Sequence, residues 1–236
     1  MDLKKMIELQ NINIVYPDKT VAIKNLTHKI ETGESIALVG GNGAGKTSLI
    51  LGLCGILSFD GTIVIDELNF SKTNANKKIL EQVRKKIGVV FQNPDDQLFM
   101  STIYDDIAFG LRNMKIAENE IKNRITDVLE KLNIMHLMDK TTLKLSGGEK
   151  RLCAIATVLV MQPDIIILDE PTAFLDPKAK KILVKVLNNL HLTKIIATHD
   201  LDFAKQICQT SLVLKNGEKF ISGNINEVLN DDENLF

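Results

Sequence analysis

A glycine-rich segment at residues 40–47, GGNGAGKT, constrains the fold of this chain more than any other feature. It fits the pattern G-x-x-x-x-G-K-[ST] and lies between an apolar run, SIALV, and a helical pattern. Glycines let the backbone curl so that successive amides converge on phosphate oxygens, and the helix that starts near Lys46 adds its positive end. An ordinary glycine-rich turn would need neither the strand nor the helix. The segment therefore predicts a nucleotide site, with Lys46 at the terminal phosphates and Thr47 on Mg2+, and by itself leaves kinases, GTPases and ATPases open.

Composition excludes several other classes of protein. The chain has 236 residues, of which 44% are hydrophobic, and this is enough for one large domain or two small ones. Lys and Arg number 29 against 30 Asp and Glu, and no block of like charge marks an arm that binds nucleic acid. We therefore expect no nucleic-acid partner.

Cysteines and apolar runs bear on location. Cys54, Cys153 and Cys208 lie far apart and have no histidines at metal-ligand spacing, so we interpret them as reduced packing residues in the cytoplasm. The opening MDLKKMIELQ lacks the apolar core of a signal peptide, and the longest apolar run, CAIATVLVM, is far shorter than the roughly 20 residues that cross a bilayer. Any membrane role is expected to depend on a partner.

The order of patterns along the chain predicts its architecture. The runs IELQNINIVY and AIKNLTHKI alternate as in an antiparallel hairpin, and a helix is predicted over KTSLILGLCGIL. Helical periodicity dominates from about residue 102 to 161, after which strands and helices alternate. We expect a mostly parallel α/β core sheet, an N-terminal antiparallel β subdomain and an inserted helical subdomain. The expected division of this single domain is 1–92 with 162–236 for the core, and 93–161 for the helical insert.

Two carboxylates follow the apolar strand in DIIILDE, residues 164–170. We expect Asp169 to hold Mg2+ through its water shell and Glu170 to polarise the attacking water. Strand ends often carry solvated acids, which is the plainer interpretation. Two adjacent acids directly before Pro171 fit the catalytic interpretation better.

The stretch LKLSGGEKRLCAIATVLV, residues 143–160, begins a helix with an exposed glycine pair. Ser146 stands at the N-cap, and Glu149 completes a sequence close to a capping box. The amides of Gly147 and Gly148 would be open to an anion. Taken alone, an ordinary capped helix explains this stretch.

Taken together, these motifs resemble the ABC-type ATPases over nearly the whole chain and in that family's order. GGNGAGKT is similar to the Walker A loop, LSGGE to the signature motif, IIILDE to Walker B and FLD to the D-loop. Gln92 is similar to the Q-loop glutamine, His199 to the switch histidine and Tyr16 to the aromatic residue that stacks on adenine. Two departures are Glu149, where glutamine is usual, and AFLD, where SALD is common.

The resemblance implies a mechanism in which two ATPase subunits pair head to tail, each ATP lying between one Walker A loop and the other subunit's signature helix. The cofactors implied are ATP and Mg2+. Asp176 would act across the interface, although its place before Pro177 is also explained by an N-cap. His199 has a competing interpretation as a capping or loop histidine. The resemblance implies the following site residues: Tyr16, Gly40, Asn42, Gly43, Ala44, Gly45, Lys46, Thr47 and Ser48 for ATP; Thr47, Gln92 and Asp169 for Mg2+; Lys46, Gln92, Glu170 and His199 for catalysis; Ser146, Gly147, Gly148 and Glu149 toward the partner's ATP.

Three classes of ABC protein compete: a transporter ATPase, a soluble ATPase and a noncatalytic scaffold. The residues for hydrolysis are all present, and the helical insert is short, which disfavours the last two; an ATPase of iron-sulfur assembly stays open. FQNPDDQLF, residues 91–99, is similar to the form in energy-coupling-factor importers of cobalt, nickel or vitamins. The resemblance implies docking at 94–99, with Gln97 foremost, onto integral membrane subunits at the cytoplasmic face of the membrane. Because the chain stops soon after ISG, in the acidic NDDENLF, we expect a weak dimer, and its complete motifs favour a homodimer over a paralogue.

Overall fold

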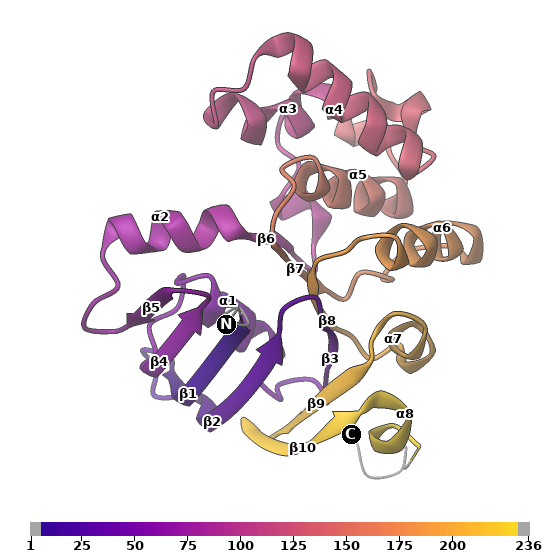
Figure 1. Cartoon of the computed structure of the whole chain (residues 1–236). Coiled ribbons are helices and arrows are strands. Elements are labelled where there is room, and N and C mark those ends of the chain that lie inside the picture. The colour runs from indigo at the N-terminus through magenta and orange to yellow at the C-terminus, as the bar shows by residue number, and fades with distance from the viewer. Residues whose placement is uncertain (1–5, 231–236) are drawn as a thin grey trace, which may run out of the picture. The chain divides into compact units, whose positions relative to one another are not determined.

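The first sheet is the predicted antiparallel one. The computed structural model describes residues 6–230, so most of the acidic tail considered above lies outside the described residues. Strands β1 (Met6–Val15), β2 (Val21–Glu31), β4 (Asp60–Ile65) and β5 (Leu68–Ser71) lie in the order β2-β1-β4-β5 (Figure 1). Ile7 pairs with Ile30 and Ile14 with Ile23, and all four side chains are buried. The alternation of apolar residues thus fixes the register of the predicted hairpin.

The second sheet is mostly parallel, as predicted for an α/β fold. Its strands are β3 (Ser35–Val39), β6 (Ile87–Val90), β7 (Ile165–Asp169), β8 (Thr193–Ala197), β9 (Thr210–Lys215) and β10 (Glu218–Asn224), in the order β10-β9-β3-β8-β7-β6. Strand β3 pairs in parallel with β8 and β9, and β10 pairs antiparallel with β9. Every residue of β3, β7 and β8 is buried, which explains why apolar residues dominate their sequences.

Helices follow the predicted amphipathic patterns with two exceptions. The helix predicted over 46–57 ends at Leu53, because Gly55 adopts φ 61° just beyond the C-cap Cys54 and stops it. Helix α2 was missed, since Val83 is its only buried residue. The helices are α1 (Lys46–Leu53), α2 (Lys77–Lys86), α3 (Ile103–Asn113), α4 (Glu118–Lys131), α5 (Gly147–Leu159), α6 (Pro177–Asn188), α7 (Leu201–Ile207) and α8 (Ile225–Val228), with short 3-10 turns η1 (Pro94–Asp96), η2 (Met135–Leu137) and η3 (Thr142–Lys144).

The chain groups into two structural units. The first comprises residues 1–87, 164–167 and 192–236, and the second comprises 88–163 and 168–191. These bounds are not those of the predicted insert at 93–161, whose extent stays a prediction.

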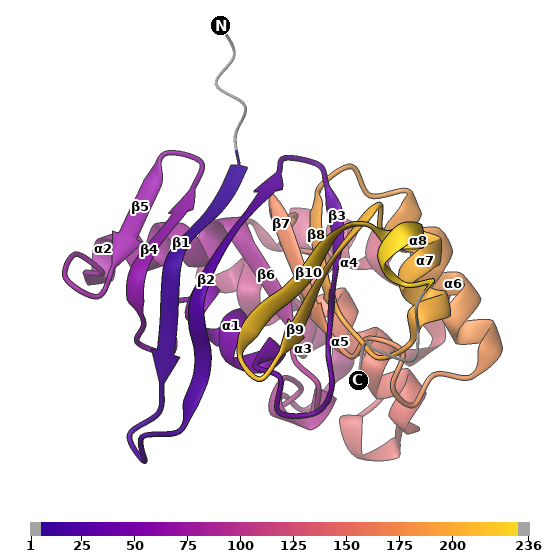
Figure 2. The same cartoon turned by 90° about the horizontal axis from the view of Figure 1, so that it is seen from below.

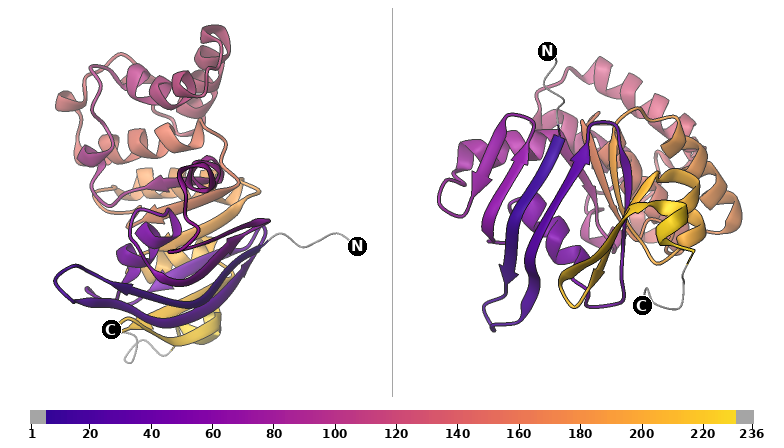
Figure 3. Two further views of the ribbon diagram at one scale, coloured as in Figure 1. Left: turned by 90° about the vertical axis from the view of Figure 1, so that its left-hand side faces the viewer. Right: turned by 60° about the horizontal axis from the view of Figure 1, so that its bottom comes forward.

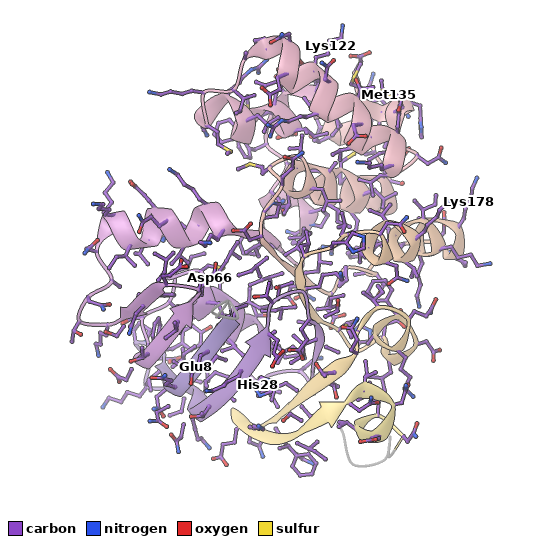
Figure 4. All side chains as sticks on the ribbon, viewed as in Figure 1. Glu8, His28, Asp66, Lys122, Met135 and Lys178 are labelled. Carbon is purple, nitrogen blue, oxygen red and sulfur yellow. The ribbon has the colours of Figure 1, made fainter. Side chains whose placement is uncertain are left out.

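Main-chain and side-chain contacts join separate segments of the first unit. The β9–β10 hairpin lies beside β2 (Figure 2), and the NH of Lys24 donates to the carbonyl of Gly217 at 2.8 Å. Asp66, at the turn between β4 and β5 (Figure 4), accepts from Lys86 at the end of α2 at 2.6 Å. Lys86 also donates to Asp164 at 3.2 Å, so one side chain joins α2 to the β4–β5 turn and to the residue before β7.

The second unit has a helical core. Helices α3, α4 and α5 pack on one another (Figure 3), and the apolar face predicted for α4 is buried, including Ile121, Ile125 and Leu129. No helix in residues 6–230 is both long and apolar enough to span a bilayer. The three cysteines of the two units, Cys54, Cys153 and Cys208, are buried free thiols. Burial raises the pKa of each thiol to about 12, as expected of packing residues.

Candidate nucleotide site

The glycine-rich loop between β3 and α1 has a shape that only glycine permits at two points. Gly45 is the N-cap of α1 with φ 102°, and a Cβ there would lie 2.4 Å from the carbonyl oxygen of Ala22. A Cβ on Gly40 would lie 2.4 Å from the carbonyl oxygen of Leu214. Around Gly43, by contrast, no atom lies within 4 Å of a built Cβ, so the loop is closely packed on the strand side and open on the other. An open concave backbone of this kind is what phosphate oxygens require.

Lys46 lies across this loop. Its ammonium group donates to the carbonyl oxygens of Gly40 at 2.6 Å and Gly41 at 3.1 Å. The next residue, Thr47, is exposed, whereas Ser48 is buried. The positive charge is therefore held at the loop, and the exposed Thr47 follows it directly in the sequence.

Tyr16 is joined to the same helix. Its hydroxyl and that of Ser48 lie 2.9 Å apart and share a hydrogen bond, which fastens the tyrosine beside the first turn of α1. The structure thus brings together Tyr16 and the loop, which are far apart in the sequence. Stacking of Tyr16 on adenine stays a prediction.

His199 follows β8 at the same edge of the sheet as the loop. Strands β3 and β8 are parallel, Leu38 pairs with Ala197, and Thr198 donates its NH to the carbonyl of Leu38 at 3.3 Å. His199 itself is exposed. It does not cap α7, because Asp200 does so by accepting from the NH of Phe203 at 3.0 Å. The carboxyl ends of adjacent parallel strands are the usual ligand side of such a sheet.

In the second unit, the two acids at the end of β7 are nearly inaccessible. Asp169 is 3% exposed and Glu170 is 8% exposed. Glu170 has φ 48°, which is uncommon for a residue other than glycine. Backbone strain of this kind persists where the surrounding structure holds it, and it is frequent at functional sites. Neither acid is an ordinary solvated residue at a strand end.

The start of α5 is a complete capping box. The NH of Glu149 donates to the Ser146 hydroxyl at 3.3 Å, and the NH of Ser146 donates to the Glu149 carboxylate at 2.8 Å. This hydrogen bond from Ser146 lowers the pKa of Glu149. The capped-helix interpretation is therefore confirmed. It also shows that glutamate can serve where glutamine is usual, because either side chain accepts this bond.

The two glycines of the signature pack against the D-loop. A Cβ on Gly147 would lie 3.2 Å from the Cβ of Phe174, and one on Gly148 would lie 3.0 Å from the carbonyl oxygen of Phe174. Phe174 has φ 67° and is 72% exposed. The N-cap interpretation of Asp176 is confirmed as well, since it accepts from the NH of Ala179 at 2.7 Å. Its role across an interface stays a prediction.

The loop after β6 is held by side chains of α5. Gln92 is exposed, whereas its carbonyl oxygen accepts from Arg151. Gln97 is half-buried: its amide donates to the Thr157 hydroxyl at 2.7 Å and to the carbonyl of Ala154 at 3.0 Å. No role was predicted for Arg151, although an arginine next to the apolar residues of the helix after the signature could have indicated one. Docking of a partner through Gln97 stays a prediction, and the structure adds an internal bracing contact for the same side chain.

Comparisons with known proteins agree with this arrangement. The family model described as ABC transporter matches residues 23–173. A putative ABC transporter ATP-binding protein of Geobacter sulfurreducens is 42% identical, covering 98% of this chain and 91% of the relative. The energy-coupling factor transporter ATP-binding protein EcfA3 of Clostridium perfringens is 41% identical, covering 97% of this chain and 81% of the relative.

Solved structures show the same likeness. CbiO1 from Clostridium perfringens, part of the ABC transporter complex cbiONQ, superimposes with a TM-score of 0.84 at 41% identity, covering 98% of this chain and 92% of that one. A dimeric ATP-binding cassette in a post-hydrolysis state, bound to ADP and Pi, gives a TM-score of 0.85 at 25% identity, covering 93% of this chain and 98% of that one.

Proposed function

This chain belongs to the ABC transporter family as an ATP-hydrolysing subunit, and from that premise we propose that it powers an importer of the energy-coupling-factor type. The observation that carries the proposal is the 41% identity, along nearly the whole chain, to both EcfA3 and CbiO1. The cargo proposed is cobalt, nickel or another trace metal, or a vitamin. Integral membrane subunits would select it, and the chain would act on the cytoplasmic face of the membrane.

The residues of the loop would bind ATP through their amides, from Gly40 to Gly45, with Lys46 neutralising the terminal phosphates. Tyr16 would support the adenine. Thr47, Gln92 and Asp169 offer the hard oxygen ligands that Mg2+ prefers, and bound Mg2+ would offset the charge of the phosphate oxygens. These oxygens suit Mg2+ better than a softer metal, and no group of three His, Cys, Asp or Glu within residues 6–230 forms another metal site.

Hydrolysis is assigned to Glu170 and His199. Glu170 would accept the proton of the attacking water, and His199 would orient the terminal phosphate and that water. The residues toward the second subunit's ATP would be Ser146, Gly147, Gly148 and Glu149, with Asp176 at the interface. ABC ATPases work as dimers, and we assign this chain to a homodimer in which ATP favours the closed arrangement.

An apolar pair beyond the Q-loop supports docking to a membrane subunit. Phe99 is 63% exposed and Phe109 is 41% exposed, and their rings meet edge to face with centroids 5.1 Å apart. Asp106 fixes the backbone under them, accepting from the NH of Phe99 at 2.9 Å and of Met100 at 2.8 Å. Adjacent aromatics held exposed on a rigid support are typical of the centre of a protein interface.

The importer proposal is tested by copurification. Tagged wild-type chain extracted in mild detergent is expected to bring down integral membrane coupling and substrate-binding proteins. Phe99→Ser is expected to weaken this binding by about 30-fold, since aromatic hot spots typically contribute about 2 kcal/mol or more. Phe220→Ser removes a similarly exposed aromatic side chain, 54% against 63%, from the other unit and is the matched control. A soluble iron-sulfur scaffold in place of the membrane proteins would favour the assembly-factor alternative.

Gln97 provides a second, smaller test. Gln97→Ala is expected to weaken transport more than basal ATPase activity, because its contacts brace the segment that carries Phe99. Losing two buried hydrogen bonds is expected to cost about 1–3 kcal/mol of stability. Transport in vesicles and ATP hydrolysis without membrane subunits are measured side by side. Equal loss of both activities would make Gln97 a residue of the fold alone.

A further inference from the structure

Among the described residues, Arg151 is the one charged residue that is completely buried. It lies on α5, five residues after Ser146, where the mostly apolar part of the helix begins. Burying a guanidinium group is costly unless its charge and its donors are matched. The partners of Arg151 therefore indicate why the chain keeps it.

The NH groups of Arg151 hold the main chain directly after β6, where the Q-loop glutamine Gln92 lies. One terminal nitrogen, Nη1, donates to the carbonyl of Phe91 at 2.6 Å, and the other, Nη2, donates to the carbonyl of Gln92. The planar fork of arginine suits two adjacent acceptors in a way that a lysine ammonium does not. The main chain of Gln92 is thus fixed from inside, while its side chain stays exposed.

Its charge lies near the two acids at the end of β7. Burial lowers the pKa of Arg151, and the negative charges of Asp169 and Glu170 raise it. Strand β6, which leads to Gln92, is the neighbour of β7 in the sheet, so the main chain that Arg151 holds and the two acids lie at the ends of adjacent strands. All of these groups belong to the second unit.

We propose that Arg151 is a positioning residue for hydrolysis: it holds the main chain at Gln92 in one arrangement with the carboxylates of Asp169 and Glu170. The inference rests on the proposed function, because it takes Gln92, Asp169 and Glu170 as the groups that act on ATP and Mg2+. Arg151 itself is buried and acts only through these groups. It therefore affects the chemical step more than the binding of ATP by the other unit's loop.

The test compares Arg151→Met, which removes the charge and the fork, with Arg151→Lys, which keeps the charge. Arg151→Met is expected to lower kcat by about 10- to 100-fold while the affinity for ATP without Mg2+ changes by less than about threefold. Arg151→Lys is expected to recover part of kcat and to need more Mg2+ for half-maximal turnover. Hydrogen exchange of the peptide around residues 91–98 is expected to quicken in both variants.

Lys150→Met is the matched control. Lys150 is the neighbouring cation on α5, and it joins the same helix to the same loop through Asp95 at 2.6 Å, but at the surface. Its loss is expected to change kcat by less than about twofold, because exposed ion pairs contribute little.

Two results would overturn the proposal: an Arg151→Met kcat close to wild type, or losses of kcat, ATP affinity and thermal stability in parallel without recovery by lysine. Should Arg151→Met not fold, Arg151→Lys decides, and unchanged kcat with unchanged Mg2+ dependence would count against the idea. Failure of the site roles on which the inference rests looks different, because Glu170→Gln would then hydrolyse ATP at the wild-type rate.

Discussion

Replacing Glu170 by glutamine is expected to leave ATP binding intact and to lower the turnover of ATP by about 10²- to 10⁴-fold, the range associated with loss of a general base. Glutamine keeps the size of the side chain and removes the group that accepts the proton. Because the strained backbone at φ 48° is held by its surroundings, the substitution should not release it. ATP that binds and is not hydrolysed should hold the dimer closed.

Two measurements check this result. Phosphate release reports turnover, and gel filtration with ATP is expected to show a stable dimer for Glu170→Gln and a monomer for the wild type after its ATP is consumed. Glu120→Gln makes the same chemical change in an exposed pair with Arg124 on α4 and is expected to behave as wild type. Wild-type turnover in Glu170→Gln would remove Glu170 from the role of base.

Replacing Gly45 by alanine is expected to be the most destabilising single change in the loop. The new Cβ would lie 2.4 Å from the carbonyl oxygen of Ala22 and 2.6 Å from Cδ1 of Ile23, and φ 102° is unfavourable for alanine. Overpacking and backbone strain together are expected to cost about 2–4 kcal/mol of the free energy of unfolding. ATP affinity should fall with it, since the turn that aims the amides and starts α1 must shift.

Gly33→Ala separates the two causes. Gly33 also has a positive φ, 79°, but no atom lies within 4 Å of a built Cβ. Alanine at this position therefore costs only the backbone strain of a positive φ, without any overpacking. Its expected cost is about 1–2 kcal/mol, with ATP affinity unchanged. Urea unfolding and binding of a fluorescent ATP analogue measure both quantities. A cost for Gly45→Ala no larger than that for Gly33→Ala would show that the loop relaxes around the extra methyl group.

The parts of the molecule that were predictable are those whose cause is local in sequence. Alternation predicted the β1–β2 hairpin, and apolar runs predicted β3, β7 and the apolar part of β8. The caps at Ser146 and Asp176 follow from residues three positions apart. Helix α2 was not predicted because only one of its side chains, Val83, is buried. The clearest local indication of this helix is its N-cap Asn76, which accepts from the NH of Ile79 at 3.0 Å.

The role of Arg151 could not be predicted from the sequence pattern for a different reason. Its acceptors, the carbonyls of Phe91 and Gln92, lie about 60 residues earlier and are main-chain groups, which leave no trace in residue type. Gln97 is similar, since its partners on α5 become neighbours only in the folded chain. A sequence motif indicates the residues that match it. It does not indicate a residue such as Arg151, whose acceptors are main-chain atoms distant in the sequence.

The packing of the signature glycines on the D-loop sets unequal limits on how the two motifs can vary. A methyl group at position 147 would press first on the Cβ of Phe174, an atom that only glycine at 174 would remove. At position 148 the obstacle is the carbonyl oxygen of Phe174, which is present whatever residue stands there. A substitution at 174 can therefore compensate for a lost glycine at the first of these positions only if it is to glycine, whereas at the second the main chain of the D-loop has to shift.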